Sequence, residues 1–473
     1  MINNLKYLSY TVSLILLNSG CSSFYSEYKN NEKIDIPKSF SEQDETNISQ
    51  DYPIDAEWWK NFNDPLLTKR IETALKYNFD LLNSATSIEM LLGQFQQVNA
   101  NLYPHFSAST SLATKEVRDS DMPNLKNGST ATHSLSIGLD NYEIDLFGKI
   151  QATNDEAKAT ILSSKYAHET LKISIASQVA NIYLNIVNIN EQIKIANENV
   201  QISKEIETKN ELKYRYGLIN ESVYLQSQAE VQNAVASKIQ FEVQRANLEK
   251  NLNALTGEFP DQQNRDEVGA FNKIIFPKLP EALPSTILQH RPDIKDAEQN
   301  LIISHAKITV ARASYYPSIS LTGMLGIQSL NLVDFVTNPA KIWSFTPALN
   351  IPIFNAGATE GAVKVAEAEH KKAINNYKKI IFNAFLDANE AIVQYNKTQE
   401  IVKYQQKRVQ VIEKAFSQAR LKYNAGTISY SDLLLVQQQW LQAKQNYQTA
   451  QQNLLTNIIS LYKSFGGGWS DNN

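Results

Sequence analysis

The residues whose types could do chemistry are few and widely spaced in this chain of 473 residues. None of the six histidines has a metal-ligand spacing such as H-E-x-x-H; they are His105, His133, His168, His290, His305 and His370. The run Gly466-Gly467-Gly468 does not precede a helix that could cradle a phosphate, and we interpret it as a flexible turn. We therefore expect no catalytic residue, no metal ligand set and no cofactor.

The one distinctive reactive group is the thiol of Cys21, the only cysteine, which cannot form an internal disulfide. Before it come Lys6 and an apolar run over residues 8–17, far shorter than the roughly 20 residues that span a membrane as a helix. This pattern indicates a secretory signal over residues 1–20. It resembles a bacterial lipoprotein signal, although Asn18 stands where that pattern prefers an aliphatic residue. We expect lipidation at Cys21; the alternative is an ordinary signal peptide with an incidental cysteine.

The residues after the cysteine are polar and have no convincing period. We expect residues 21–57 to form a lipidated, extended arm. By the same resemblance, Ser22 directly after the cysteine favours the outer membrane. The formal net charge of -4 is not basic enough to suggest a nucleic-acid partner.

Two uninterrupted stretches predict very long helices. Residues 149–216 contain no proline or glycine, and residues 358–423 contain no proline. Apolar residues recur every three or four positions, and each stretch would form a helix on the order of 100 Å long. Such helices need partners along their whole length, because propensity alone stabilises them little.

Shorter apolar helices flank each long one. They are expected over residues 223–255 and 432–462, and two more begin at Asn78 and Arg291. Two short helices stacked end to end roughly match one long helix, which predicts a rod of helices. The exposed faces are rich in Gln and Asn, a pattern that plain solvation and a water-filled interior would both produce.

Four segments alternate with the period of a strand: residues 106–112, 133–139, 318–324 and 343–354. One face is apolar and the other small and polar, which is typical of a membrane β-barrel, and a slip in phase indicates a bulge near Asp140. The alternative is a soluble sandwich, for which four strands are too few. A barrel needs about eight strands, so several copies must contribute, and the oligomer is obligatory if the sheet spans a membrane.

The chain contains two copies of this helix-and-strand unit. Asp80 matches Asp293 and Tyr103 matches Tyr316, at one common offset in residue number. Phe147 matches Phe354 and Tyr216 matches Tyr423, at a shorter offset. Gly217 matches Gly426, at an offset slightly longer than the second one. We therefore expect the second copy to lose six residues in a loop before its phenylalanine, and to gain two at the turn before its glycine.

Taken together, these motifs resemble the TolC-type outer-membrane efflux factors, in the lipoprotein subgroup of channels that serve RND-type pumps. The most specific pieces are residues 291–294 (RPDI), Tyr316-Pro317, the paired residues 145–148 and 352–354, and the ending at residues 461–469. The resemblance implies a homotrimer with a 12-stranded barrel in outer-membrane lipid and an α-helical tunnel in the periplasm. An inner-membrane pump and a periplasmic adaptor would deliver small molecules such as drugs to it.

This resemblance also divides the chain. It implies a first repeat over residues 58–256, with strands at about 103–113 and 133–147, and a second over residues 285–462, with strands at about 316–324 and 341–354. An equatorial linker, residues 257–284, would join them, and residues 463–473 would form a C-terminal tail.

The resemblance places a periplasmic gate at the two helix turns. They contain Gly217 and Gly426, and relatives often carry an aspartate six residues after the glycine. The second turn has Asp432 there and the first has Val223. The family gate pairs Tyr423 with the missing first acid, so we expect Tyr423 to bond instead to Ser222 or Glu221. A second acid of the pattern is Leu435 here.

Asp432 admits two explanations. Three copies near a symmetry axis would repel one another and attract a cation. Alternatively, the carboxylate lies near the start of a helix and interacts with its dipole.

Two other functions stay open at this stage. A periplasmic coiled-coil adaptor or scaffold would share the anchor and the helices, but it would not need four membrane-type strands. A channel for type I protein secretion would share the whole architecture, although the lipoprotein signal and the GGGW ending lean toward small-molecule efflux by analogy.

Overall fold

The computed structural model describes residues 28, 37, 40, 56–117, 128–259, 269, 271, 274–277 and 285–469. The predicted signal and Cys21 lie outside them. The chain divides into two compact units. Residues 1–33, 87–164 and 297–377 form the sheet unit, and residues 34–86, 165–296 and 378–473 form the helical unit.

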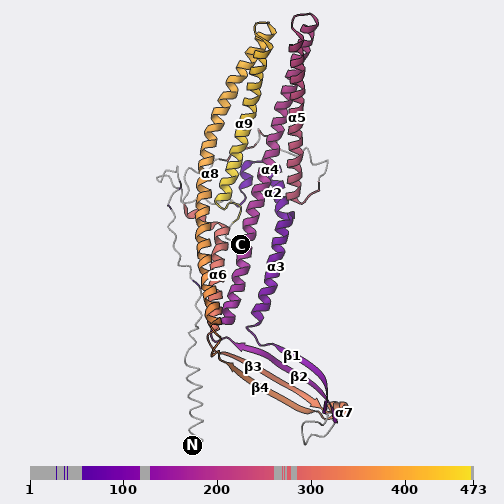
Figure 1. Cartoon of the computed structure of the whole chain (residues 1–473), viewed down its shortest axis with the longest axis vertical. Helices are drawn as coiled ribbons and strands as arrows, with labels where there is room; N and C mark the ends of the chain where they lie inside the picture. Colours follow the sequence, from indigo (N-terminus) through magenta and orange to yellow (C-terminus); the bar gives the residue numbers. More distant parts are fainter. Residues whose placement is uncertain are drawn as a thin grey trace. The chain divides into compact units, whose positions relative to one another are not determined.

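Helices dominate the described part of the chain (Figure 1). Their bounds are α2 (Pro65–Tyr77), α3 (Phe79–Ala100), α4 (Lys149–Arg215), α5 (Glu221–Thr256), α6 (Pro292–Ala313), α7 (Leu332–Thr337), α8 (Ala358–Asn424) and α9 (Tyr430–Ser464), with 3-10 turns η2 (Trp58–Phe62) and η5 (Ser285–His290). The two long helices, α4 and α8, have 67 residues each, as the sequence predicts.

Two helices, α2 and α7, were not predicted from the sequence. α2 begins at Pro65 after Asp64, whose side chain accepts hydrogen bonds from Leu66 N (2.9 Å) and Leu67 N (3.2 Å). This is the expected start of a helix, a capping acid followed by proline. The other, α7, has six residues, too few for a helical period to be recognised.

The four predicted strands form one antiparallel sheet in the order β1 (Phe106–Val117), β2 (Gly128–Ile144), β3 (Ser318–Ser329), β4 (Ala340–Asn350). The register of β2 against β3 shifts between Leu139 and Tyr142, which confirms the predicted bulge near Asp140. β1 to β3 extend beyond the predicted segments, because the backbone ladder continues where the side-chain alternation stops. β4 ends at Asn350, so its predicted continuation to Phe354 was wrong; Pro352 has no N–H to donate to a ladder.

The duplication has a different alignment from the predicted one. The difference in residue number between the starts of α4 and α8 equals the difference between their ends. Both equal the difference between Gly217 and Gly426. Gly217 N donates to Tyr214 O (2.9 Å), and Gly426 N donates to Tyr423 O (3.1 Å). Tyr423 therefore corresponds to Tyr214, and pairing it with Tyr216 was wrong. The two extra residues of the second copy lie before α8, directly before Gly357, which has a positive φ.

The helical unit has a core around Trp58, Phe62 and Tyr183, all fully buried. A second cluster lies along the ends of α4, α8 and α9, where the rings of Phe416 and Trp440 stack 5.0 Å apart.

Two of the sequence motifs meet in this unit. Arg291 bonds to Asp293 through Nε (3.0 Å) and Nη2 (2.7 Å), and its Nη1 donates to Ser464 O (2.8 Å). Trp469 Nε1 donates to His290 O (2.9 Å). Hydrogen bonds of the RPDI motif and of the chain ending thus connect the start of α6 to the end of α9.

Candidate functional site

The sheet is amphipathic, and its apolar face is uncovered within the described part of the chain. The register aligns Ile137, Leu325 and Trp343 in one row across three strands. These side chains are 61%, 68% and 76% exposed. Exposed apolar patches of this kind mark a surface for another molecule or for lipid.

The opposite face carries small polar residues that bond to one another. Ser109 and Ser136 hydroxyls lie 3.0 Å apart, and those of Ser111 and Ser134 lie 2.7 Å apart. Among the described strands, β1 and β4 each pair on one side only, so the sheet has two open backbone edges. In lipid such edges have to be paired.

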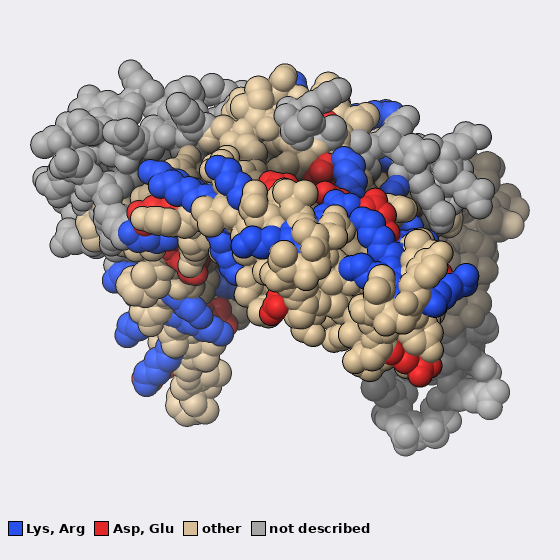
Figure 2. Space-filling model, turned by 90° about the horizontal axis from the view of Figure 1, so that it is seen from above, with Lys and Arg blue, Asp and Glu red and all other residues tan. Residues whose placement is uncertain are grey.

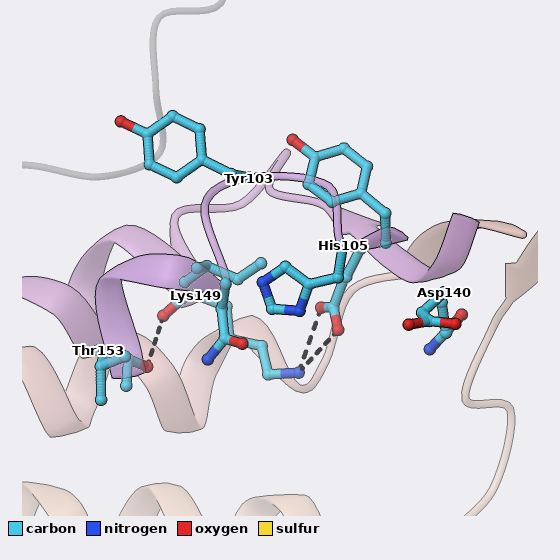
Figure 3. Close-up of a pocket in the computed structure, with 11 residues that line it drawn as sticks. Tyr103, His105, Asp140, Lys149 and Thr153 are labelled. Atoms are coloured by element: carbon cyan, nitrogen blue, oxygen red, sulfur yellow. Dashed lines mark hydrogen bonds and ion pairs between the residues drawn. The ribbon is translucent and has the colours of Figure 1, made fainter. Parts of the chain in front are cut away.

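A polar cavity of about 290 Å³ lies where α3, the bulge of β2 and α4 meet (Figure 3). Lys149 Nζ bonds to the Glu143 carboxylate at 3.2 and 3.4 Å, and the His105 ring bonds to Ala100 O at 2.9 Å. Thr153 Oγ1 donates to Lys149 O (2.9 Å). These bonds satisfy the polar groups locally, and we interpret the cavity as a joint between strand and helix.

The two turns that connect long and short helices have the same backbone. Gly217 and Gly426 have φ of 69° and 74°, and a Cβ there would meet nothing within 4 Å. Leu218 N and Thr427 N each donate to a carbonyl five residues back, at 2.8 and 3.0 Å. Glycine is needed for the left-handed backbone, not for space.

Tyr423 lies at the end of α8, and its hydroxyl bonds to α4. Its hydroxyl donates to Asn210 Oδ1, and the two residues are 5% and 0% exposed. Lys213 Nζ lies 4.1 Å from the centre of the Tyr423 ring. Burial raises the pKa of Tyr423, although the hydrogen bond with Asn210 opposes this.

The expected contact of Tyr423 with Ser222 or Glu221 is therefore wrong in this chain. Both residues are exposed at the start of α5. Asn210 was missed by the sequence analysis, yet a signal exists. It continues a buried stripe of α4 through Ser203 and Ile206, at steps of three and four. A polar side chain on such a stripe needs a partner.

A further ionic contact connects the same helices near the turns. Arg420 pairs with Glu205, and Lys209 Nζ donates to Asn424 Oδ1 at 3.4 Å. Seen from the end of the molecule that carries the turns, basic side chains are prominent (Figure 2). Independently of that view, exposed basic residues between the middle and the end of α8 include Lys403, Lys407, Arg408, Lys414 and Lys422.

Asp432 forms a capping box at the start of α9. Its Oδ2 accepts from Ser429 N (3.2 Å) and Ser429 Oγ (2.7 Å), and Asp432 N donates to Ser429 Oγ (3.1 Å). In the first repeat Asn220 caps α5 alone, accepting from Val223 N at 3.1 Å. Val223 thus lacks the carboxylate that would complete the box. The helix-start explanation of Asp432 has direct support in these bonds.

No helix among the described residues combines the length and the apolar character needed to cross a bilayer.

Comparison with known proteins places these features in a family. The sequence matches the outer membrane efflux protein family over residues 70–258 and 283–467. It is 29% identical to a probable outer membrane lipoprotein, SilC of Salmonella typhimurium, over 98% of this chain and 99% of that protein. It is also 29% identical to a probable efflux pump outer membrane protein, TtgC of Pseudomonas putida, over 87% of this chain and 85% of that protein.

Among solved structures, the outer membrane channel CmeC of Campylobacter jejuni is similar, with a TM-score of 0.84 and 26% identity. The match covers 93% of this chain and 95% of that one. The family match spans most of the chain and includes both repeats. The chain therefore belongs to the outer membrane efflux protein family and is an outer-membrane efflux channel.

Proposed function

We propose that three copies of this chain form one passive conduit through the outer membrane. Each copy would give its four strands to a 12-stranded barrel, with the apolar face toward lipid and the serine-rich face toward the lumen. The observation that carries this proposal is the sheet with an exposed apolar face and two edges, β1 and β4, that the described strands leave unpaired. A closed ring of copies pairs every edge.

Cys21 is the proposed site of the lipid anchor, reached from the body of the protein by residues 21–57. The lipoprotein name of the Salmonella typhimurium relative, which aligns along nearly its whole length, supports this assignment. Acyl chains would add about 0.8 kcal/mol of membrane affinity per buried methylene. The helices would then extend into the periplasm, and residues 257–284 would form the belt between the two repeats.

The proposed partners are a periplasmic adaptor and an inner-membrane pump, and the proposed cargo is small molecules. The name of the Pseudomonas putida relative, an efflux pump outer membrane protein, supports this choice over protein secretion. The gate is assigned to the turns with Gly217 and Gly426, with Tyr423, Asp432 and Ser222 around them. The bond from Tyr423 to its partner on α4 would hold α8 against α4 in the closed state.

The test is the conductance of the purified protein in a planar bilayer, with its mass in detergent measured in the same preparation. A trimer mass with discrete ion-passing steps supports the conduit. A folded monomer that inserts no pores contradicts it. Small-molecule accumulation in cells lacking the gene, compared with secretion of a reporter protein, then distinguishes the two kinds of cargo.

A further inference from the structure

A short helix at one end of the sheet carries apolar side chains that the described part of the chain leaves uncovered. α7 follows β3, at the end of the sheet away from α4 and α6 (Figure 1). Its Leu332, Val333 and Val336 are 63%, 73% and 79% exposed. Apolar side chains gathered in this way mark a surface for another molecule or for lipid.

A ring contact shows on which side of the sheet α7 lies. The centres of the Phe335 and His133 rings are 6.2 Å apart, with an angle of 46° between the planes. His133 alternates in step with Leu135 and Ile137 along β2, so its side chain leaves the sheet on the apolar face. α7 therefore lies on the side of the exposed apolar row, and not on the serine-rich side.

The sequence of α7 separates apolar from polar side chains around the helix axis. Successive residues are about 100° apart, so Leu332, Val336 and Val333 follow Phe335 at about 60°, about 100° and about 160°. The remaining arc carries polar residues, Asp334 and Thr337. With Phe335 turned toward the sheet, the helix presents three apolar side chains on one flank and its carboxylate on the other. This division is typical of helices that lie in a membrane surface.

The neighbours of α7 bear on what covers its apolar flank. The helix packs against β3 and β2, which are the two inner strands of the sheet. Copies of the chain in a ring meet at the outer strands, β1 and β4, so a neighbouring copy joins the sheet away from this helix. The apolar flank is instead continuous with the face that the proposed barrel turns toward lipid.

The strand that follows α7 has the composition of a membrane boundary. Lys341 pairs with Ile327 across β3 and β4, so it lies on the apolar face, where it is exposed. Trp343, the next residue of β4 on that face, is 76% exposed. Aromatic girdles mark the boundaries of membrane barrels. A lysine beside one keeps its stem on apolar surface and extends its ammonium toward lipid phosphates.

We propose that α7 is an interfacial helix that inserts Leu332, Val333 and Val336 among the acyl chains of the outer leaflet. Its partner is a phosphate-bearing lipid of that leaflet. Such helices bury their apolar face about 5–10 Å into the boundary between headgroups and acyl chains. The inference rests on the proposed function, in which the apolar face of the sheet meets lipid and the long helices extend into the periplasm. The end with α7 then reaches the outer leaflet.

The test is photocrosslinking in intact cells whose lipids carry labelled phosphate. The crosslinking residue benzoylphenylalanine replaces Val336 in one variant, Asp334 on the polar side of α7 as the matched control, and Leu325 of the apolar row as the reference. We expect labelled lipid adducts at Val336 and Leu325, and at least about fivefold less at Asp334. Acyl chains on Cys21 carry no phosphate, so the proposed anchor does not contribute to the signal.

The trimer band of each variant shows whether it assembles, and Val333 is a second position for the crosslinker if replacement of Val336 prevents assembly. Lipid adducts at Leu325, with Val336 joined to a second copy or to no more lipid than Asp334, would overturn the inference and leave the barrel intact. Assembled trimers without lipid adducts at Leu325 would contradict the proposed orientation of the sheet, and the inference would fail with it.

Discussion

Tyr423 shows how one residue can keep its role while its partner changes. The resemblance to efflux factors pointed to this tyrosine, but the family acid is missing at Val223. The structure supplies Asn210 on α4 instead, a residue that no local motif identifies. Its importance follows from burial, which depends on packing between two helices that belong to different repeats.

Removing the hydroxyl in Tyr423→Phe should loosen the end of α8 from α4. Asn210 is buried, and its amide nitrogen already has no partner in the described part of the chain, so the change leaves the whole side chain unsatisfied. The expected cost is about 1–3 kcal/mol. In bilayer recordings, we expect a higher open probability. Tyr404→Phe, at an exposed tyrosine of the same helix, is the control and should behave as wild type.

The effect of the Asp432 charge on ions can be separated from the role of its side chain in capping α9. Asp432→Asn keeps a side-chain oxygen for Ser429 but removes the charge. If three carboxylates gather a cation at the gate, cation selectivity and block by multivalent cations should both decrease. Asp432→Ala should show the same change together with a less stable α9. Unchanged selectivity in both variants would leave capping as the only role.

Stability should decline in alkali because of buried tyrosines. Burial is the main cause that raises the pKa of Tyr183, and the Asp64 carboxylate that accepts its proton at 2.8 Å adds to it. Above the ordinary pKa of about 10, the unfolded chain ionises this tyrosine and the folded chain does not. Stability present below about pH 10 is therefore lost as pH rises, by up to about 1.4 kcal/mol per pH unit.

The matched variant for this effect is Tyr183→Phe. It loses two hydrogen bonds and starts less stable, so the comparison is between slopes. The free energy of unfolding, measured from about pH 9 to 11, should fall less steeply in the variant than in the wild type. Equal slopes would assign the alkaline loss to other groups.

At the scale of elements, periodicity was a reliable guide. It predicted both long helices to within one residue, because uninterrupted helical spacing over so many turns has no competing explanation. The predicted alignment placed the two-residue difference between the repeats wrongly, because Tyr423 was matched with Tyr216 on residue type alone. The backbone instead matches the glycines with positive φ, Gly148 with Gly357 and Gly217 with Gly426.

These glycines give a stability prediction. Gly426→Ala should destabilise the turn by about 1–2 kcal/mol, purely through the left-handed backbone, since a Cβ meets nothing there. Gly93→Ala lies in the interior of α3, also with nothing within 4 Å, and should stabilise by about 0.5–1 kcal/mol. Chemical denaturation of both variants checks the opposite signs.

At the scale of the whole molecule, the alternation of the strands identified the sheet and its bulge. The family match then removed the adaptor hypothesis, since this family is one of channels. The pairing order could not be predicted from the sequence, because register depends on contacts between repeats. The exposed row through Leu325 and Trp343 appears only once that order is known.

This row predicts the effect of a charge on either face of the sheet. Trp343→Lys places a cation on the apolar face and should cost about 2–4 kcal/mol near the middle of the bilayer. Ser344→Lys places it on the polar face of the same strand. We expect fewer trimers in outer-membrane fractions for the first variant only. Equal assembly of both would contradict the proposed orientation.

The two unlike edges, β1 and β4, have a genetic consequence. In a ring of three copies, every β1 meets a β4 of another copy, so each subunit takes part in two junctions. A chain with one damaged edge would still occupy a place and leave the ring open. In a cell that makes intact and damaged chains equally, only about one ring in eight would contain no damaged chain. Edge alleles should therefore be dominant, whereas alleles that only unfold the chain should be recessive.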